Sequence, residues 1–261
     1  MIKPLTTDTQ GLFRLDGQTA LVTGGSKGLG EAMARALAGA GADVVITSRH
    51  LEEAQTVADR ISQDSGQQVI AFQADAGDRQ QADASVAHTI QRLGKLDILV
   101  NNAGVNIPCD ALELSESDWD AVQGVNLKGL FFLSQRCARH MKEHGGRVVN
   151  MASINGVVGY YKRAAYCSSK AGVVNLTRVL ALEWAQYDIN VNAVGPTFIL
   201  TPLTQSTFDD PVLREDLIQR IPKGRVGMPE DVVGAVVFLA SPAAAMITGH
   251  TLMVDGGWTA I

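Results

Sequence analysis

Short apolar runs rich in β-branched residues alternate with helical patterns along the whole chain of 261 residues. This alternation predicts βαβ units, which build a parallel sheet covered by helices on both faces. We therefore expect an α/β fold. The predicted strands are Thr19–Thr23, Val44–Thr47, Val69–Phe72, Ile98–Asn101, Val148–Met151, Val191–Val194 and Thr251–Val254. The predicted helices include Leu29–Ala40, Leu51–Gln63, Arg79–Leu93 and Ser117–His140.

No linker rich in Pro, Ser or Gly divides the chain, so we expect one domain over residues 1–261. The least regular stretch, residues 197–227, is expected to form a lid, because ligands of such sheets bind outside the carboxyl ends of the strands. Val232–Val254 lacks charged residues and is long enough to suggest a membrane span. Ser241-Pro242 and the polar turn Thr248-Gly249-His250 interrupt it, which favours a helix, a turn and a buried strand.

Composition excludes several classes of protein. The net charge of −5 argues against a nucleic-acid partner, which normally requires a basic excess. Three dispersed cysteines without a CxxC motif predict neither a disulfide framework nor a zinc ribbon, and a reducing cytoplasm is the simplest setting. The first ten residues contain no apolar core of a signal peptide. His140 and His144 have a metal-binding spacing, but no further ligand cluster supports them, so we expect no metal.

A glycine-rich turn, Thr23–Gly30, lies directly between the first predicted strand and the first predicted helix. Glycines allow the backbone to approach a pyrophosphate closely, and a helix N-terminus offers free N–H groups and a positive dipole end. The spacing GxxxGxG differs from the GxGxxG fingerprint, and a plain packing turn is the alternative interpretation. Its placement between strand and helix favours dinucleotide binding.

The end of the second predicted strand indicates which dinucleotide binds. A carboxylate there would hold the ribose 2′-hydroxyl of NAD, whereas an arginine would favour the 2′-phosphate of NADP. The chain has Ser48 and Arg49 at this position, and Lys27 in the glycine-rich turn adds a second cation. We predict NADP(H) as the preferred cofactor, with NAD(H) possible. The alternative is that both cations are solvated surface residues.

Ser153, Tyr166 and Lys170, which come after the fifth predicted strand, have side chains that suit acid–base chemistry. Tyr166 and Lys170 are four positions apart, so on a helix they share one face, and Ser153 stands two residues beyond the strand. A phenol is a weak acid at neutral pH, and a nearby ammonium group lowers its pKa. Tyr166 could then exchange a proton with a carbonyl or alcohol oxygen that Ser153 orients.

These segments together resemble the short-chain dehydrogenase/reductase family over about residues 15–261. The resemblance rests on TGGSKGLG at 23–30, NNAG at 101–104, Asn126, Ser153 and YCSSK at 166–170. It implies a Rossmann-like, doubly wound parallel sheet of seven strands, a nicotinamide cofactor and a catalytic tetrad of Asn126, Ser153, Tyr166 and Lys170. In this family pattern Asn126 breaks the regularity of its helix and supports a proton relay to Lys170, which also holds the nicotinamide ribose.

The resemblance also implies a set of cofactor contacts around the carboxyl ends of the strands. One departure is Thr197, where family members usually have glycine after the proline, so the lid geometry there is open. The implied cofactor residues are Gly24, Ser26, Lys27, Gly28, Leu29, Gly30, Ser48, Arg49, Asp75, Ala76, Asn102, Ala103, Gly104, Tyr166, Lys170, Pro196, Ile199 and Thr201.

For the substrate, residues 11–30 and 254–260 look like gluconate 5-dehydrogenases and related sugar-acid dehydrogenases. Ser153, Asn155 and Tyr166 are the implied substrate residues, and Lys162 or Arg163 would bind a carboxylate unless both are solvated. The alternatives are a 3-oxoacyl-[acyl-carrier-protein] reductase or a broad ketone reductase. A non-enzymatic cofactor sensor is a further alternative, but such proteins commonly lose the Tyr or the Lys.

The helix predicted over Ala171–Trp184 is apolar on more than one side, which predicts burial on more than one side. One side would meet the sheet and the other a second copy of the chain. The family resemblance points to a homotetramer, and a homodimer is the alternative. We therefore expect a small-molecule substrate and self-association, with no nucleic acid and no membrane.

Overall fold

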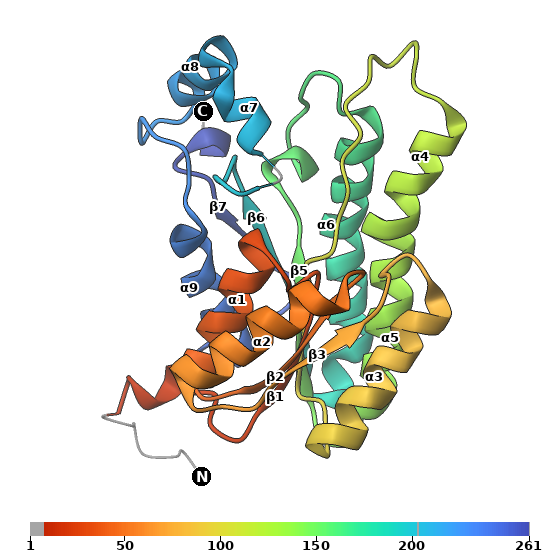
Figure 1. Cartoon of the computed structure of the whole chain (residues 1–261), viewed down its shortest axis with the longest axis vertical. Coiled ribbons are helices and arrows are strands. Elements are labelled where there is room, and N and C mark those ends of the chain that lie inside the picture. The colour runs from red at the N-terminus through yellow and green to blue at the C-terminus, as the bar shows by residue number, and fades with distance from the viewer. Residues whose placement is uncertain (1–7, 203, 261) are drawn as a thin grey trace.

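The computed structural model describes residues 8–202 and 204–260. Seven parallel strands form one sheet in the order β3-β2-β1-β4-β5-β6-β7 (Figure 1). The chain starts near the middle at β1, runs outward to β3, and returns through β4 to the other edge. This order confirms the doubly wound, Rossmann-like fold, with a topological switch point between β1 and β4. The strands are β1 Thr19–Thr23, β2 Asp43–Ser48, β3 Val69–Gln73, β4 Ile98–Asn101, β5 Gly146–Met151, β6 Ile189–Pro196 and β7 Thr251–Val254.

Helices cover both faces of the sheet, as Figure 1 shows. Successive strand residues point to opposite faces, so Val22 packs into one core and Leu21 into the other. This explains why the strands are continuous apolar runs. One face is covered by α1 (Gly28–Gly39), α2 (Leu51–Ser65) and α9 (Pro229–Ala240), and the other by α3 (Arg79–Leu93), α5 (Leu130–Met141) and α6 (Ala164–Trp184).

Two predicted elements differ from the structure. The helix expected over Ser117–His140 is wrong as a single element. It consists of α4 (Glu116–Gln123), a π-helical turn (Gly124–Gly129) and α5. The widened turn allows the buried side chain of Asn126 to bond the backbone of Val105 instead of packing on a regular helix. The strand β7 is partly exposed rather than buried, because it lies at the edge of the sheet.

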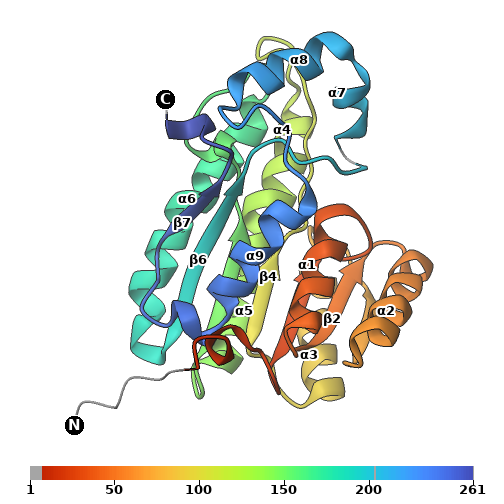
Figure 2. The same cartoon turned by 90° about the vertical axis from the view of Figure 1, so that its left-hand side faces the viewer.

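The stretch after β6 contains two short helices, α7 (Gln205–Asp209) and α8 (Pro211–Arg220). The Asp210 carboxylate accepts hydrogen bonds from the N–H groups of Val212 and Leu213, and Pro211 suits the first helical position, so α8 begins there. Figure 2 shows both helices at the upper end of the molecule. Among residues 8–202 and 204–260, no helix is long and apolar enough to cross a membrane.

Candidate active site

The glycine-rich turn joins β1 to α1 with Gly24 and Gly28 at positive φ. A Cβ on Gly30 would lie 2.0 Å from the carbonyl oxygen of Gly24, so a side chain cannot be accommodated there. No side chain caps the N-terminus of α1, which leaves its first N–H groups available. A cradle made of backbone alone at a helix N-terminus fits the pyrophosphate of a dinucleotide.

The segment after β4 holds this turn in place. The Asn102 side chain donates to the carbonyl oxygens of Thr23 (2.9 Å) and Gly24 (3.1 Å). In return, the Thr23 hydroxyl accepts from the backbone N–H groups of Asn102 and Ala103, both at 3.0 Å. A narrow cavity in this region is lined by Thr23, Ala76 and Ala103, among others. The structure therefore brings together residues that were predicted as cofactor contacts from three separate segments.

Two cations, Lys27 and Arg49, lie beside the contact between the glycine-rich turn and the end of β2. The Ser26 hydroxyl donates to the Ser48 hydroxyl at 2.9 Å, which joins the glycine-rich turn to the end of β2. Lys27 and Arg49 are the next residues on each side, both are exposed, and neither forms an ion pair among the described residues. Their charges are thus available to a ligand. Asp75 lies two residues beyond β3, and its carboxylate accepts the N–H of Gly77 at 2.8 Å.

Ser153, Tyr166 and Lys170 come together at the carboxyl end of β5 and the start of α6. The side chains of Ser153 and Tyr166 are hydrogen-bonded to each other. The Lys170 Nζ lies 5.6 Å from the centre of the Tyr166 ring and donates to the carbonyl oxygen of Met151 at 2.6 Å. A hydroxyl, a phenol and an ammonium group at one point suit the exchange of a proton with a substrate oxygen.

Asn126 is fully buried in the π-helical turn beside this group. Its carbonyl oxygen accepts the Val105 N–H at 2.8 Å, and its amide donates to the Val105 carbonyl (2.9 Å) and the Ser169 hydroxyl (3.1 Å). A Cβ on Gly104 would lie 3.3 Å from Asn126 Oδ1 and 3.8 Å from Lys170 Nζ. The glycine therefore leaves space between the two polar groups.

Burial shifts the pKa values of the two titratable groups in opposite directions. It raises the pKa of the Tyr166 phenol, and the hydrogen bond with Ser153 offsets this only in part. It lowers the pKa of Lys170 to about 8. We expected Lys170 to lower the phenol pKa, but the net shift has the other sign, because desolvation of the phenol outweighs its polar neighbours.

In the loop after β5, the two cations that precede Tyr166 have different environments. Lys162 has a positive φ of 57°, is exposed, and pairs with Asp110 at 3.4 Å. Arg163 is partly buried, and its charge acts on Tyr166 and lowers that pKa. Asn155 is 6% exposed and lies two residues from Ser153. Of the two cations, Arg163 is thus the less exposed, whereas Lys162 is held at the surface.

An aromatic cluster that the sequence did not suggest lies next to this loop. The rings of Tyr160, Phe198 and Trp258 contact one another, with centres 5.3, 5.7 and 6.3 Å apart. The three residues follow β5, β6 and β7, which are neighbours in the sheet. No spacing within one segment could have indicated this cluster, because only the strand order brings the residues together.

The residues after β6 approach the glycine-rich turn from the other side. A Cβ on Gly28 would lie 3.4 Å from Thr201 Cβ, so Thr201 packs against the turn. Ile199 is buried, and Pro196 is the last residue of β6. At the unusual position after the proline, the Thr197 N–H donates to the Val254 carbonyl at 3.2 Å, while its hydroxyl is buried without a partner among the described residues.

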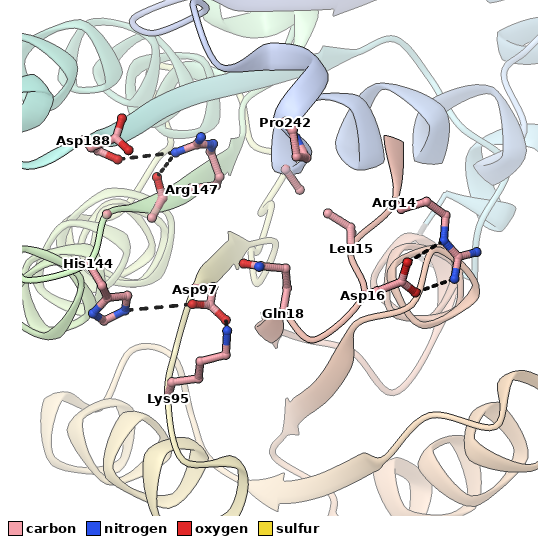
Figure 3. A pocket seen from close by; sticks show the side chains of 13 residues that line it. Arg14, Leu15, Asp16, Gln18, Lys95, Asp97, His144, Arg147, Asp188 and Pro242 are labelled. Carbon is pink, nitrogen blue, oxygen red and sulfur yellow. Dashed lines mark hydrogen bonds and ion pairs between the residues drawn. The ribbon is translucent and has the colours of Figure 1, made fainter. Parts of the chain in front are cut away.

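A cavity of about 620 Å³ lies at the opposite end of the sheet (Figure 3). It is lined by charged residues near the amino ends of β1, β4 and β5, including Lys95, Asp97 and Arg147. None of the predicted catalytic, cofactor or substrate residues lines it. Ligands of open α/β sheets bind at the carboxyl ends of the strands. We therefore place the candidate active site at that end of the sheet and not at this cavity.

Comparison with known proteins places the chain in a large group of enzymes. A family described as enoyl-(acyl carrier protein) reductase matches residues 24–259. The chain is 41% identical to a 2-dehydro-3-deoxy-D-gluconate 5-dehydrogenase of Dickeya dadantii over 95% of this chain and 98% of that protein. It is 42% identical to an NAD-dependent glycerol dehydrogenase of Listeria innocua, covering 95% of this chain and 96% of the relative.

A crystal structure of a gluconate 5-dehydrogenase from Burkholderia cenocepacia, in complex with NADP and tartrate, has the same fold. The two structures superpose with a TM-score of 0.92 at 37% identity, covering 96% of this chain and 98% of the other.

Proposed function

Because the chain belongs to the short-chain dehydrogenase/reductase family, whose members are oxidoreductases that act on CH–OH groups, we propose that it interconverts a secondary alcohol and a ketone. The observation that carries this proposal is the contact of Ser153, Tyr166 and Lys170 beside the backbone cradle of α1. When bound, a nicotinamide accepts a hydride from the alcohol carbon or returns it to the carbonyl carbon.

In the oxidation, the Tyr166 phenolate takes the hydroxyl proton while the hydride leaves the carbon that carries this hydroxyl, and in the reduction the Tyr166 phenol gives its proton to the substrate oxygen. Ser153 orients the substrate oxygen through its hydroxyl. Lys170, which the Met151 carbonyl holds, provides a positive charge next to the phenol and binds the ribose. We assign Asn126 to the proton path, because its Oδ1 and the Lys170 Nζ lie 3.3 and 3.8 Å from the position that a Cβ on Gly104 would take.

NADP(H) is the proposed cofactor, and NAD(H) is the weaker alternative. The support is the pair of unpaired cations, Lys27 and Arg49, on either side of the Ser26–Ser48 contact. A 2′-phosphate would receive a charge-assisted hydrogen bond from each cation. The relative from Burkholderia cenocepacia is described with NADP, whereas the relative from Listeria innocua is NAD-dependent.

The proposed substrate is a sugar acid such as gluconate or 5-ketogluconate. The relatives from Dickeya and Burkholderia act on such acids by name, and the latter holds tartrate, a hydroxy acid. The alternative is a 3-oxoacyl-[acyl-carrier-protein] reductase or a broad ketone reductase. Docking of an acidic carrier protein would require a basic patch, and a net charge of −5 does not favour one.

We also propose that residues 1–261 act as one cytoplasmic nucleotide-binding domain, with a lid over 197–227 and a partner copy on α6. On α6, Val173 and Leu180 are buried against the sheet, whereas Val179 and Leu182 are 41% and 82% exposed. Exposed leucine and valine on a long helix are typical of an interface between copies.

The proposal is tested by measuring turnover of gluconate, 5-ketogluconate, acetoacetyl thioesters and simple ketones with both cofactors. We expect the sugar acids to have the highest kcat/KM, and NADP(H) to be preferred by roughly tenfold or more, since hydrogen bonds to charged groups are strong. Highest turnover of the thioesters would support the alternative. A strong NAD(H) preference would refute the assignment of Lys27 and Arg49.

A further inference from the structure

Buried polar atoms without a hydrogen-bond partner are concentrated in the loops around Tyr166. Of the eight such side-chain atoms among the described residues, four belong to loops that follow β4, β5 and β6. Buried polar atoms normally have partners, so an unpartnered group in this position indicates a missing ligand contact. The four atoms are Asn106 Oδ1, Asn155 Oδ1, Arg163 Nη1 and Thr197 Oγ1.

Arg163 carries the strongest signal, because it is the charged member of this set. Its Nη1 is shielded from solvent and donates to no partner, and the guanidinium forms no ion pair among the described residues. A shielded cation without an anion is costly, so an anion from outside the chain would stabilise it. The backbone of Arg163 is held in place by an isolated parallel β-bridge with Cys109. Within this bridge the Cys109 N–H donates to the Lys162 carbonyl at 3.1 Å.

The position of Arg163 relates it to the reacting groups. Arg163 lies three residues before Tyr166 and three after Tyr160, and its carbonyl accepts the Cys167 N–H at 2.7 Å. Its positive charge opposes the rise in pKa that burial causes in both phenols. The aromatic cluster itself is uncharged, and its rings can pack against the C–H groups of a ligand. Lys162 differs from Arg163 in burial and in pairing, because it is exposed and already has Asp110 as its partner.

Asn155 supplies the complementary polar group. Its backbone N–H donates to the Ser153 hydroxyl at 3.1 Å, which holds the residue beside the serine that orients the substrate oxygen. The Oδ1 atom is an acceptor without a donor, and it is buried. A hydroxyl group on a carbon near the reacting carbon would satisfy it.

We propose that Arg163 binds the carboxylate of the substrate while Asn155 Oδ1 accepts a hydrogen bond from one of its hydroxyl groups. The site then selects polyhydroxy acids over neutral polyols, although relatives of both kinds exist. This inference rests on the proposed oxidoreductase function. It goes beyond it by naming the residues that recognise the acid and by excluding Lys162 from that role.

The test compares D-gluconate with D-glucitol, which has the same six-carbon chain with a CH₂OH group in place of the carboxylate. For Arg163→Gln we expect kcat/KM for gluconate to fall by roughly 100-fold, mainly through KM, because one partner of a buried charge pair is lost. Turnover of glucitol should fall far less. Arg163→Lys should recover part of the gluconate activity, and Lys162→Gln should leave the ratio of the two substrates unchanged.

Calorimetric titration of gluconate into the protein loaded with NADPH, which cannot oxidise the alcohol, provides a second readout, and binding should weaken in Arg163→Gln but not in Lys162→Gln. An equal loss for gluconate and glucitol in Arg163→Gln would overturn the inference, as would a wild-type protein that prefers glucitol. Oxidation of other secondary alcohols but of neither sugar would overturn it too, while leaving the oxidoreductase function intact. No turnover of any alcohol or ketone would instead refute the proposed function.

Discussion

At the amino ends of β1 and β4 charged side chains pair with one another, whereas at the carboxyl ends of the same sheet several buried polar atoms have no partner among the described residues. Around the cavity in Figure 3, Asp97 pairs with Lys95 at 2.8 Å and accepts the Thr19 N–H at 2.8 Å. At the other end, Asn155 Oδ1 and Arg163 Nη1 are buried without partners.

The two ends of the sheet contribute to different properties of the protein, namely stability and ligand binding. Polar groups that are paired within the chain stabilise the fold and have little left to offer a ligand. Polar groups that are held in place but unsatisfied reduce stability until a ligand completes them, which is typical of active sites. Substitutions at the carboxyl end should therefore change activity more than stability, and substitutions at the amino end should do the reverse.

The largest expected effect is at Tyr166. Tyr166→Phe removes the hydroxyl that exchanges the proton, so kcat should fall by roughly 10²- to 10⁴-fold. The unfolding midpoint should change little, because Ser153, which loses its hydrogen bond with the phenol, keeps the Asn155 N–H as a partner. Steady-state turnover and thermal unfolding of the same preparation measure both quantities.

Tyr187→Phe is the matched control, since it makes the same change near the amino end of β6, next to the cavity residue Asp188. Its turnover should equal that of the wild type. If a Tyr166→Phe variant kept near-full turnover on its best substrate, Tyr166 would take no part in the proton transfer. The functional difference between the two ends of the sheet would then not hold.

The fold could be predicted from the sequence because its signals are local. The strands and the glycine-rich turn depend on residues close together in the chain, and the observed strands contain all seven predicted ones. The π-helical turn interrupts a locally helical pattern because Asn126 bonds Val105, 21 positions earlier. Such a distant contact leaves no periodic signal.

The candidate site could be predicted where motifs have fixed spacing, as for Tyr166 and Lys170. The choice between Lys162 and Arg163 could not, because it depends on the positive φ of Lys162 and on Asp110 from another loop. The aromatic cluster of Tyr160, Phe198 and Trp258 likewise depends on three loops meeting at one edge. The pKa shift of Tyr166 depends on burial, which the i,i+4 spacing does not reveal.

The second prediction concerns the stability cost of Lys170, which is 4% exposed and has a pKa of about 8 in the folded protein. The unfolded chain has a higher lysine pKa, near the ordinary 10.5, so it binds more protons between these two values. Stability of the wild type should therefore rise as the pH increases from about 8 to 10.5. The gap corresponds to roughly 3 kcal/mol.

Lys170→Met removes this dependence. The wild type should therefore gain stability relative to the variant as the pH rises through that range. Denaturant unfolding at pH 7 and pH 10 measures it. Lys142→Met, which removes an exposed lysine, controls for the loss of one charge. A difference that does not change with pH would show that the folded protein does not penalise the charged Lys170.

The smallest expected effect belongs to the amino end, at Asp97. Asp97→Ala leaves the buried N–H of Thr19 without its acceptor and Lys95 without its partner, so the free energy of unfolding should fall by about 1–3 kcal/mol. Asp97→Asn can still accept from Thr19, so it should cost less. Because the cavity is remote from Tyr166, kcat/KM of both variants should match the wild type at temperatures where they are folded. A change in kcat/KM without a loss of stability would mean that the amino end also takes part in function, and that paired charges are not a sign of a purely structural role.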